Sequence, residues 1–301
     1  MNKQIHHLNL ISKIENYCKT NGLSDGLIDT KIPSLKFYTT KEISQFSSII
    51  YEPCLCLALQ GEKAVGFDDK MYGYSPSQYL LTCANIPANV KIVKASKDIP
   101  YVSLVLTFSL EEIYEVIKET NFESSSKSKK DDIPFCFNRL DETIIDPVYR
   151  LVKLLDKSQE TIDFMYPLIK KEIIFVLLQN DRDFLTNYVS EGTLTNQIVK
   201  AISKIKENFN ESINMSLLSK EIGISEASFY QNFKKLTTMS PLQYQKKIRL
   251  EEAKQLLTTK NLDASTVAFE VGYESASQFS REYSRMFGMS PKAHSDFLKN
   301  S

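Results

Sequence analysis

The sequence is poor in the residues that build common metal and disulfide sites. Histidine occurs only at His6, His7 and His294, which argues against a histidine-rich metal site. The five cysteines are an odd number and contain no Cys-x-x-Cys pair, which argues against a disulfide framework and against a zinc knuckle. We therefore expect no metal and no other cofactor.

Long hydrophobic runs are also lacking. The most apolar run, residues 173–178, is far too short to cross a bilayer. The N-terminal segment has no uninterrupted apolar core of the kind that a signal peptide needs. Its apolar residues instead fall three positions apart, as in an amphipathic helix, at Ile5, Leu8, Ile11 and Ile14. These features predict a cytoplasmic protein without a membrane partner.

An excess of basic charge is missing as well, since 37 Lys and Arg balance 37 Asp and Glu. A neutral chain argues at first sight against a nucleic-acid binder. Residues 191–301, however, contain 15 basic and 12 acidic side chains, which leaves 22 against 25 for residues 1–190. A basic C-terminal part joined to an acidic N-terminal part is typical of a DNA-binding half attached to a non-binding half.

Short β-type segments separated by glycine, proline and aspartate fill residues 34–108. They read LKFYT, CLCLALQ, AVGF, YLLT, VKIV and YVSLVLTF. Many short strands at this spacing predict a small barrel or sandwich. A helix capped by Ser109, with Glu112 at its third position, follows the last strand. The polar segment over residues 123–132 is predicted to be a linker or loop.

Two longer helices are predicted over residues 141–155 and 161–180. Amphipathic helix pairs of this kind either close a β domain or form a dimer surface, and the sequence leaves both interpretations open. The chain is thus predicted to have two domains: residues 1–190 with a β-barrel and attached helices, and an all-helical domain over residues 191–301 with turn residues between its helices.

The C-terminal part contains an internal repeat. IGISEASFYQNFKKLTTMSP at 222–241 is similar to VGYESASQFSREYSRMFGMSP at 271–291. A shift of fifty residues places Phe229 on Phe279 and Phe233 on Tyr283, so these aromatic pairs are expected to be buried. Two copies are too few for a solenoid.

Each copy has the signals of a helix, a tight turn and a second helix. Gly223 and Gly272 supply the left-handed turn, and Ser225 and Ser275 cap the second helix. The leading helices are expected to bury Leu217, Leu218 and Ile222 in the first copy and Val267, Ala268 and Val271 in the second. The second helices are expected to expose amide, hydroxyl and basic groups on their outer faces, and a short helix with such groups suits the major groove of DNA.

Basic residues near the ends of the second helices are predicted to neutralise phosphates: Lys234, Lys235 and Arg285. The strongly helical segment over residues 244–257 joins the two copies. Such a connector sets two recognition helices about one DNA turn, roughly 34 Å, apart on one face of the duplex.

Residues 195–297 resemble the DNA-binding domain of the AraC/XylS family of bacterial transcription regulators. The resemblance is carried by SLLSKEIGISEASFYQNFKK, RLEEAKQLL and STVAFEVGYESASQFSREYSRMFGMSP. It implies base contacts by Ala227, Tyr230 and Gln231 in the first recognition helix, and by Ser277, Gln278, Ser280 and Arg281 in the second. Thr238 departs from the family, which usually has glycine there.

The N-terminal half is similar to the cupin-like domain of one subgroup of these regulators, through EPCLCLALQGEK, YLLTCANIP, ASKDIPYVSLVL and YPLIKKEIIFVLL. It is expected to bind a small-molecule effector, to dimerise, or both. Cys54 and Cys56 alternate in a strand and face the same side. Together with Cys83 they are either effector-responsive thiols or small apolar fillers of the core.

The sequence therefore predicts a sequence-specific transcription regulator that binds promoter DNA and is not an enzyme. The resemblance to the family implies that its partner is RNA polymerase and that it acts as an activator. A cupin-type enzyme with a helical appendage is the alternative, but its metal site normally needs two or three histidines, and none lies between His7 and His294. A DNA-repair methyl acceptor fused to the same DNA-binding domain would need more cysteines close in sequence than Cys54 and Cys56.

Overall fold

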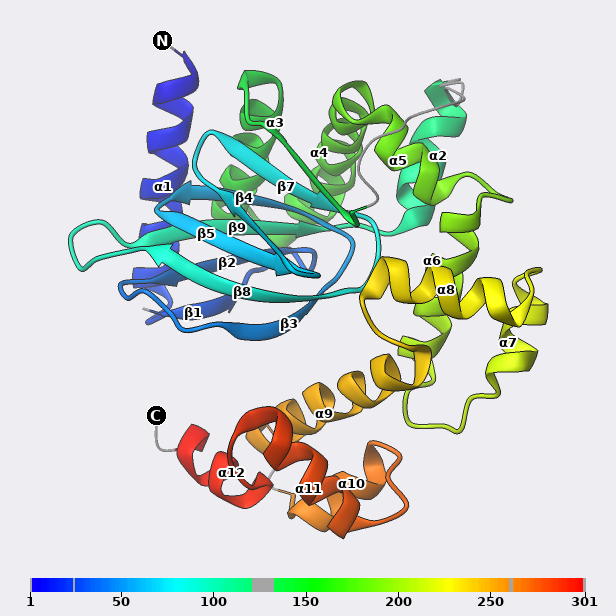
Figure 1. Ribbon diagram of the computed structural model, residues 1–301. Coiled ribbons are helices and arrows are strands. Elements are labelled where there is room, and N and C mark those ends of the chain that lie inside the picture. The colour runs from blue at the N-terminus through cyan, green and yellow to red at the C-terminus, as the bar shows by residue number, and fades with distance from the viewer. Residues whose placement is uncertain (1, 24, 121–132, 260–261, 300–301) are drawn as a thin grey trace. The chain divides into compact units, whose positions relative to one another are not determined.

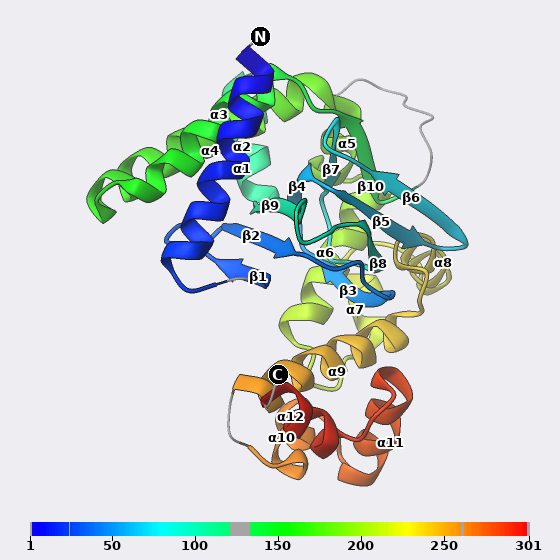
Figure 2. The ribbon, with the colours of Figure 1, turned by 90° about the vertical axis from the view of Figure 1, so that its left-hand side faces the viewer.

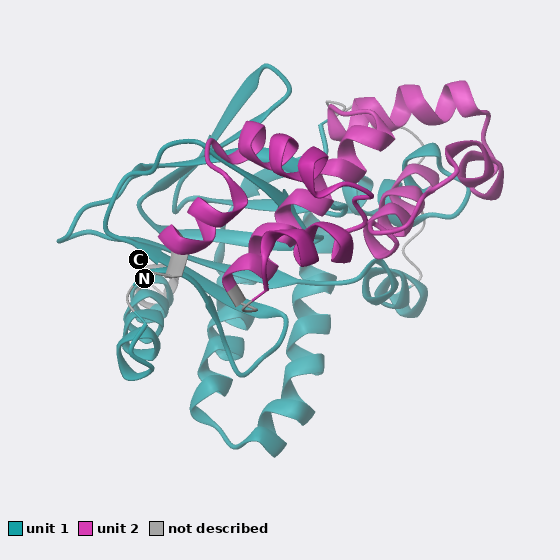
Figure 3. Ribbon diagram, turned by 90° about the horizontal axis from the view of Figure 1, so that it is seen from below, with its two compact units in different colours: residues 1–196 teal, residues 197–301 magenta. Residues whose placement is uncertain are grey.

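The computed structural model describes residues 2–23, 25–120, 133–259 and 262–299. The chain divides into two units, residues 1–196 and 197–301 (Figure 3). The division falls within α6 (Leu194–Glu207). The segment predicted as a linker, residues 123–132, lies outside the described residues.

The first unit contains two antiparallel sheets (Figure 1). In its described residues, six strands lie in the order β1-β2-β9-β4-β7-β10 and four in the order β3-β8-β5-β6. Their bounds are β1 (Gly26–Asp29), β2 (Leu35–Thr40), β3 (Ser47–Tyr51), β4 (Cys54–Gln60), β5 (Glu62–Phe67), β6 (Lys70–Tyr74), β7 (Gln78–Thr82), β8 (Ile86–Lys94), β9 (Tyr101–Thr107) and β10 (Phe135–Arg139). No pairing of described strands joins the sheets. The α+β prediction is confirmed, with two open sheets where the sequence suggested a barrel.

The strands that the sequence analysis identified are the inner strands of the two sheets. β4 is the clearest case, because it lies between β9 and β7 and is buried from Cys54 to Leu59. The four strands that were missed, β1, β3, β6 and β10, are all sheet edges. An edge strand pairs on one side only and carries more exposed residues, so its hydrophobic pattern is weak.

Helices accompany the sheets of the first unit. They are α1 (Asn2–Thr20), α2 (Leu110–Thr120), α3 (Glu142–Lys153), the short 3₁₀ helix η1 (Leu154–Asp156), α4 (Gln159–Asn180) and α5 (Arg182–Val189). α1 packs on α3, α3 on α4, and α4 on α2 (Figure 2). The predicted cap of α2 is confirmed, because Glu112 N donates to Ser109 Oγ at 3.1 Å and Ser109 N to Glu112 Oε2 at 2.7 Å. The apolar face that the sequence predicted for the N-terminal helix is wrong at Leu8, because Leu8 is exposed on α1 and Leu10 is buried instead.

A buried carboxylate ties the helices to the first sheet. Asp181, between α4 and α5, accepts hydrogen bonds from the Tyr79 hydroxyl of β7, from Cys136 Sγ at 3.1 Å and from Asn138 Nδ2 at 3.0 Å on β10. Three donors compensate the cost of burying a polar group. The bond to Asp181 and burial together raise the pKa of Tyr79, with burial the larger cause.

The second unit is helical throughout its described residues. After the end of α6 it contains α7 (Met215–Glu221), α8 (Glu226–Thr237), α9 (Pro241–Thr259), α10 (Ala264–Glu270), α11 (Ala276–Phe287) and α12 (Pro291–Lys299). α10, α11 and α12 each pack on α9. The predicted connector is thus a longer helix than residues 244–257.

Candidate nucleic-acid interface

α7 and α8 form the first helix-turn-helix. Asn214 caps α7 through bonds from Ser216 N and Leu217 N, and Gly223 turns the chain at φ 79°. Ser225 then caps α8, as predicted, by accepting from Ser228 N at 3.2 Å. These local bonds fix where each helix begins and ends.

The aromatic pair of α8 anchors this unit in the core. Phe229 and Phe233 are fully buried, and their rings meet edge to face 5.5 Å apart. Phe233 also contacts the buried ring of Tyr244 on α9 at 5.4 Å. Burial of the pair is confirmed, but the leading helix differs from the prediction: Leu217 is 61% exposed, and Leu218 takes the buried position.

α10 and α11 form the second helix-turn-helix. Asp263 caps α10, Gly272 turns the chain at φ 86°, and Ser275 caps α11 by accepting from Gln278 N. Phe279 and Tyr283 are fully buried, as predicted. The buried residues packed around them are Leu250, Ala253, Leu257, Val267, Ala268, Val271 and Tyr273.

Arg249 lies on α9, the helix that connects the two helix-turn-helix elements, and it bonds to backbone next to each of them. Its guanidinium donates to the carbonyls of Phe209 at 2.6 Å, Glu211 at 2.9 Å and Gly272 at 2.8 Å. The first two acceptors precede α7 and the third lies in the turn between α10 and α11. Three charge-assisted bonds from one planar fork give a fixed geometry that a lysine cannot supply.

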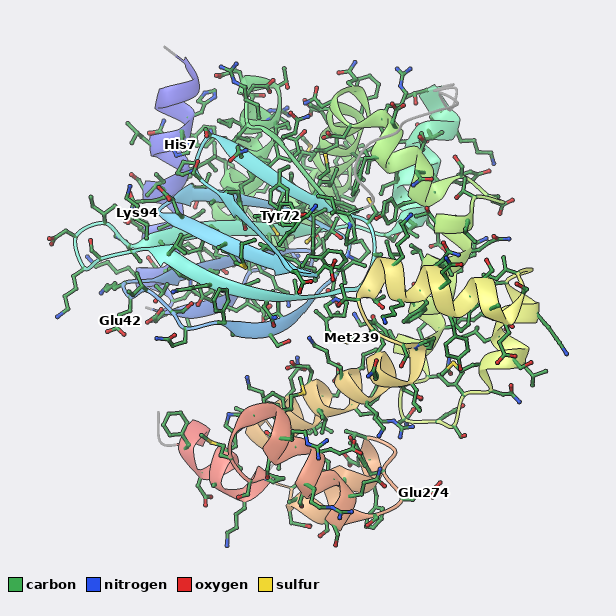
Figure 4. The ribbon with its side chains drawn as sticks, in the orientation of Figure 1. His7, Glu42, Tyr72, Lys94, Met239 and Glu274 are labelled. Carbon is green, nitrogen blue, oxygen red and sulfur yellow. The ribbon has the colours of Figure 1, made fainter. Side chains whose placement is uncertain are left out.

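The residues assigned to base contacts lie on the outer faces of α8 and α11. Ala227, Tyr230 and Gln231 are exposed on α8, and Ser277 and Arg281 are exposed on α11. Gln278 and Ser280 are half-buried beside them. In Figure 4, Met239 marks the turn after α8 and Glu274 marks the turn before α11.

The residues assigned to phosphates lie in the last turns of the same helices. Lys234 and Lys235 are exposed near the end of α8, and Arg285 is exposed near the end of α11. A long basic side chain at such a place can reach a backbone phosphate while the helix N-terminal part faces the bases.

Glu282 is a functional candidate that the sequence analysis missed. Its Oε1 accepts from Lys246 Nζ at 2.9 Å and from Gln278 Nε2 at 3.1 Å, and its Oε2 accepts from the Tyr273 hydroxyl at 2.9 Å. The i,i+4 spacing of Gln278 and Glu282 on a predicted helix was the available signal. The approach of Lys246 and Tyr273 depends on tertiary packing.

The exits of the two recognition helices differ in sequence but share one backbone conformation. Thr238 ends α8 at φ 62°, and Gly288 ends α11 at φ 76°. In both, the amide bonds back to the carbonyl four residues earlier. Thr238 therefore adopts the left-handed conformation that glycine tolerates and a β-branched residue resists.

In the first unit the structure brings two of the three singled-out cysteines together. Cys54 Sγ and Cys56 Sγ lie 3.5 Å apart in the buried strand β4. The hydrogen bond from Cys54 and the nearby Lys63 ammonium lower the pKa of Cys56, while burial opposes them. Cys83 directly follows Thr82, the residue of β7 that pairs with Cys54. Burial raises the pKa of its thiol, and its electrostatic neighbours are Cys136 and Asp181.

In the part of the chain that the structure describes, no three His, Cys, Asp or Glu side chains gather as metal ligands would. None of the described helices is long and apolar enough to span a bilayer.

A β-rich unit followed by a helical unit with two helix-turn-helix elements is the architecture of a two-domain DNA-binding regulator. Two family models match the chain: the AraC-type transcriptional regulator N-terminus over residues 31–183, and a helix-turn-helix domain over residues 218–296. The first match covers half of the chain, so the protein belongs to the AraC-type transcriptional regulators. The predicted family is confirmed, and membership points to a regulator and away from an enzyme.

Curated relatives support the same family. The raffinose operon transcriptional regulatory protein RafR of Pediococcus pentosaceus is 34% identical over 114 residues, which are 36% of this chain and 41% of RafR. The HTH-type transcriptional activator RhaS of Salmonella schwarzengrund is 22% identical over 160 residues, 51% of this chain and 55% of RhaS. The chain thus spans about half the length of these relatives.

Solved structures of ToxT from Vibrio cholerae share the fold. An apo ToxT variant superimposes with a TM-score of 0.60 at 12% identity, covering 91% of this chain and all of ToxT. ToxT bound to an unsaturated fatty acid gives a TM-score of 0.56 at 13% identity, covering 89% and 96%. Agreement over most of both chains confirms the architecture of a β-rich N-terminal domain followed by a helical C-terminal domain.

Proposed function

We propose that the protein regulates transcription by placing α8 and α11 in successive major grooves on one face of a promoter. The observation that carries this proposal is the repeated arrangement of the second unit. Each of these helices buries an aromatic pair, Phe229 with Phe233 or Phe279 with Tyr283, and exposes a polar face. A helix in this setting presents base-reading side chains without loosening its own packing.

In this proposal the two recognition helices divide their residues into two roles. Base edges are read by Ala227, Tyr230 and Gln231 of α8 and by Ser277, Gln278, Ser280 and Arg281 of α11. Phosphates are held by Lys234, Lys235 and Arg285. Because the surplus of basic charge is small, affinity for random DNA is low and specificity depends on few side chains.

The test is selection of bound sequences from a random duplex library with the full chain, followed by footprinting of the selected duplex. We expect two protected elements whose centres are about 10 base pairs apart, one for each recognition helix. Equal affinity for selected and random duplexes would contradict sequence-specific binding.

We propose further that a small molecule bound by the N-terminal unit controls this binding. A fatty acid is the first ligand to test, because a fatty-acid complex is among the ToxT structures that share this fold. Bound ligand stabilises the native state, so oleate should raise the unfolding temperature in a concentration-dependent way. An unchanged unfolding temperature would contradict a fatty acid as effector.

Cys54 and Cys56 are proposed to take part in the response of this unit, with Cys83 as the third candidate. The pair lies in the central strand β4, so modification of either thiol would disturb the pairing of β4 with β7 and β9. Cys54→Ser, Cys56→Ser and Cys83→Ser should each change the effector dependence of DNA binding. An unchanged dependence in one variant would exclude that thiol from the response.

A homodimer that recruits RNA polymerase as an activator is the proposed working form, acting in the cytoplasm beside its promoters and without catalytic turnover. α4 supplies the argument for dimerisation, because Phe164 is 72% exposed and Leu168 is 53% exposed one turn later. Light scattering of the Phe164→Glu, Leu168→Glu variant should give the mass of a monomer. A wild-type protein that is itself monomeric at micromolar concentration would contradict the dimer.

A further inference from the structure

Glu282 is held on three sides by groups from different elements. Lys246 of α9 lies 2.9 Å from Oε1, and the Tyr273 hydroxyl, from the turn before α11, donates to Oε2 at 2.9 Å. Partial burial acts to raise the pKa of Glu282, but these bonds outweigh it and hold the pKa below its ordinary value. The group is therefore an anion of fixed position, balanced by Lys246.

Gln278 is the third partner of Glu282, and it is the one of the three that is proposed to contact a base. Its Nε2 donates to Glu282 Oε1 at 3.1 Å. The opposite amide orientation would place Oε1 of Gln278 against a carboxylate oxygen, and two acceptors repel each other. The carboxylate thus selects one of the two orientations that a surface glutamine otherwise exchanges.

From this geometry we infer that Glu282 is a positioning residue that makes Gln278 specific for adenine over guanine. One amide hydrogen of Gln278 is engaged by Glu282, which leaves the second hydrogen and Oε1 for the base. That donor–acceptor pair matches N7 and the N6 amino group of adenine, whereas guanine offers acceptors at both positions. The inference rests on the proposed DNA-binding function and deepens it.

The first helix-turn-helix provides an internal comparison. Fifty residues earlier, Ser228 and Asn232 occupy the positions of Gln278 and Glu282. There the Asn232 amide donates back to the Ser228 carbonyl at 2.8 Å, and no carboxylate stands at the position. An amide oriented by a carboxylate is therefore present at this position in α11 and not in α8, so the two helices are expected to differ in base recognition.

The experiment measures base preference by selection from a random duplex library with wild type, Gln278→Ala, Glu282→Ala and Glu282→Gln. Wild type should prefer adenine over guanine by about tenfold at one position. Gln278→Ala identifies that position by losing the preference there. Glu282→Ala should lower the same ratio to roughly twofold or less and leave other positions unchanged. Glu282→Gln keeps an acceptor for Gln278 and should restore part of the preference.

Two controls separate positioning from folding. Tyr273→Phe removes the bond to Oε2 but leaves Gln278 on Oε1, so it should keep the wild-type base preference. Asn232→Ala alters the matched position of α8 and should leave the Gln278 position unchanged. If Glu282→Ala retains the tenfold ratio that Gln278→Ala loses, the inference is overturned and the proposed function survives. If wild type selects no sequence, the proposed function itself fails.

Discussion

Arg281 is the side chain whose removal should change DNA recognition most. It is exposed on α11, and its guanidinium can donate two hydrogen bonds to one guanine. Arg281→Ala should weaken binding to the selected duplex by about 1–3 kcal/mol and leave random DNA nearly unaffected. Fluorescence anisotropy with both duplexes measures this difference. Equal losses on both would contradict a base-reading role.

Lys234 should behave in the opposite way, because a phosphate contact carries no sequence information. It is exposed in the last turn of α8. Lys234→Ala should weaken binding to all duplexes alike and reduce the slope of log K against log salt by about 1. A titration series in potassium chloride gives the slope, and an unchanged slope would remove Lys234 from the phosphate contacts.

Thr238 is a strained residue whose replacement should stabilise the protein. At φ 62° its β-branched side chain is held in the left-handed region, although Oγ1 donates to the Thr237 carbonyl. Thr238→Gly should raise the free energy of unfolding by about 0.5–1 kcal/mol, measured by urea denaturation. Gly288→Ala, at the matched exit with φ 76° and open space around the new methyl, should lower it by a similar amount. A loss of stability in Thr238→Gly would show that the Oγ1 bond outweighs the strain.

At the scale of elements, the turn before each recognition helix decides how firmly that helix is held. Gly223 and Gly272 share a positive φ, but their surroundings differ. A Cβ on Gly272 would lie 2.1 Å from the backbone carbonyl oxygen of Asn210, whereas on Gly223 the nearest atom is the side-chain Nε2 of Gln197 at 3.6 Å. The second turn is therefore packed against backbone, which cannot move aside cheaply.

The two alanine substitutions form a matched pair. Gly223→Ala should cost about 1–2 kcal/mol of unfolding free energy from backbone strain alone. Gly272→Ala should cost clearly more, because Asn210 and the Arg249 bond to the Gly272 carbonyl must both shift. Urea denaturation of the full-length variants measures both. Equal costs would show that the loop carrying Asn210 adapts freely.

For the whole molecule, His294 should dominate the change of stability near neutral pH. Burial, with the positive charge of Lys254 as a smaller cause, lowers the pKa of His294 below its ordinary value of 6.5. The unfolded chain then binds the proton more readily, so the free energy of unfolding falls as the pH drops through 6.5 toward the folded pKa.

The variant His294→Gln tests this assignment. Urea denaturation at about pH 7.5 and about pH 5.5 should show a smaller loss of stability for the variant than for wild type. Glutamine has no titration in this range, and all other groups are the same in both proteins. An identical pH dependence would assign the effect to other residues.

Particular residues show which features of the fold and of the candidate site could be predicted from the sequence. The inner strands, the caps Ser109, Ser225 and Ser275, and the buried aromatic pairs were all predicted, because each depends on a local pattern. Leu217 was expected to be buried because helical spacing does not distinguish it from Leu218. Cys83 was grouped with Cys54 because spacing along the chain does not show which groups surround each thiol: β7 pairs with β4, yet the electrostatic neighbours of Cys83 are Cys136 and Asp181.

By itself, the sequence determined the family, the α+β class and the two recognition helices, since hydrophobic periodicity, turn glycines and caps act within a few residues of one another. Tertiary structure alone decided that the two sheets are open. It also decided that Asp181 is buried, with hydrogen bonds from Tyr79 and Asn138. It also decided the approach of Lys246 and Tyr273 to Glu282. These arrangements join groups that are distant along the chain, and only the packing of the folded chain brings their donors and acceptors together.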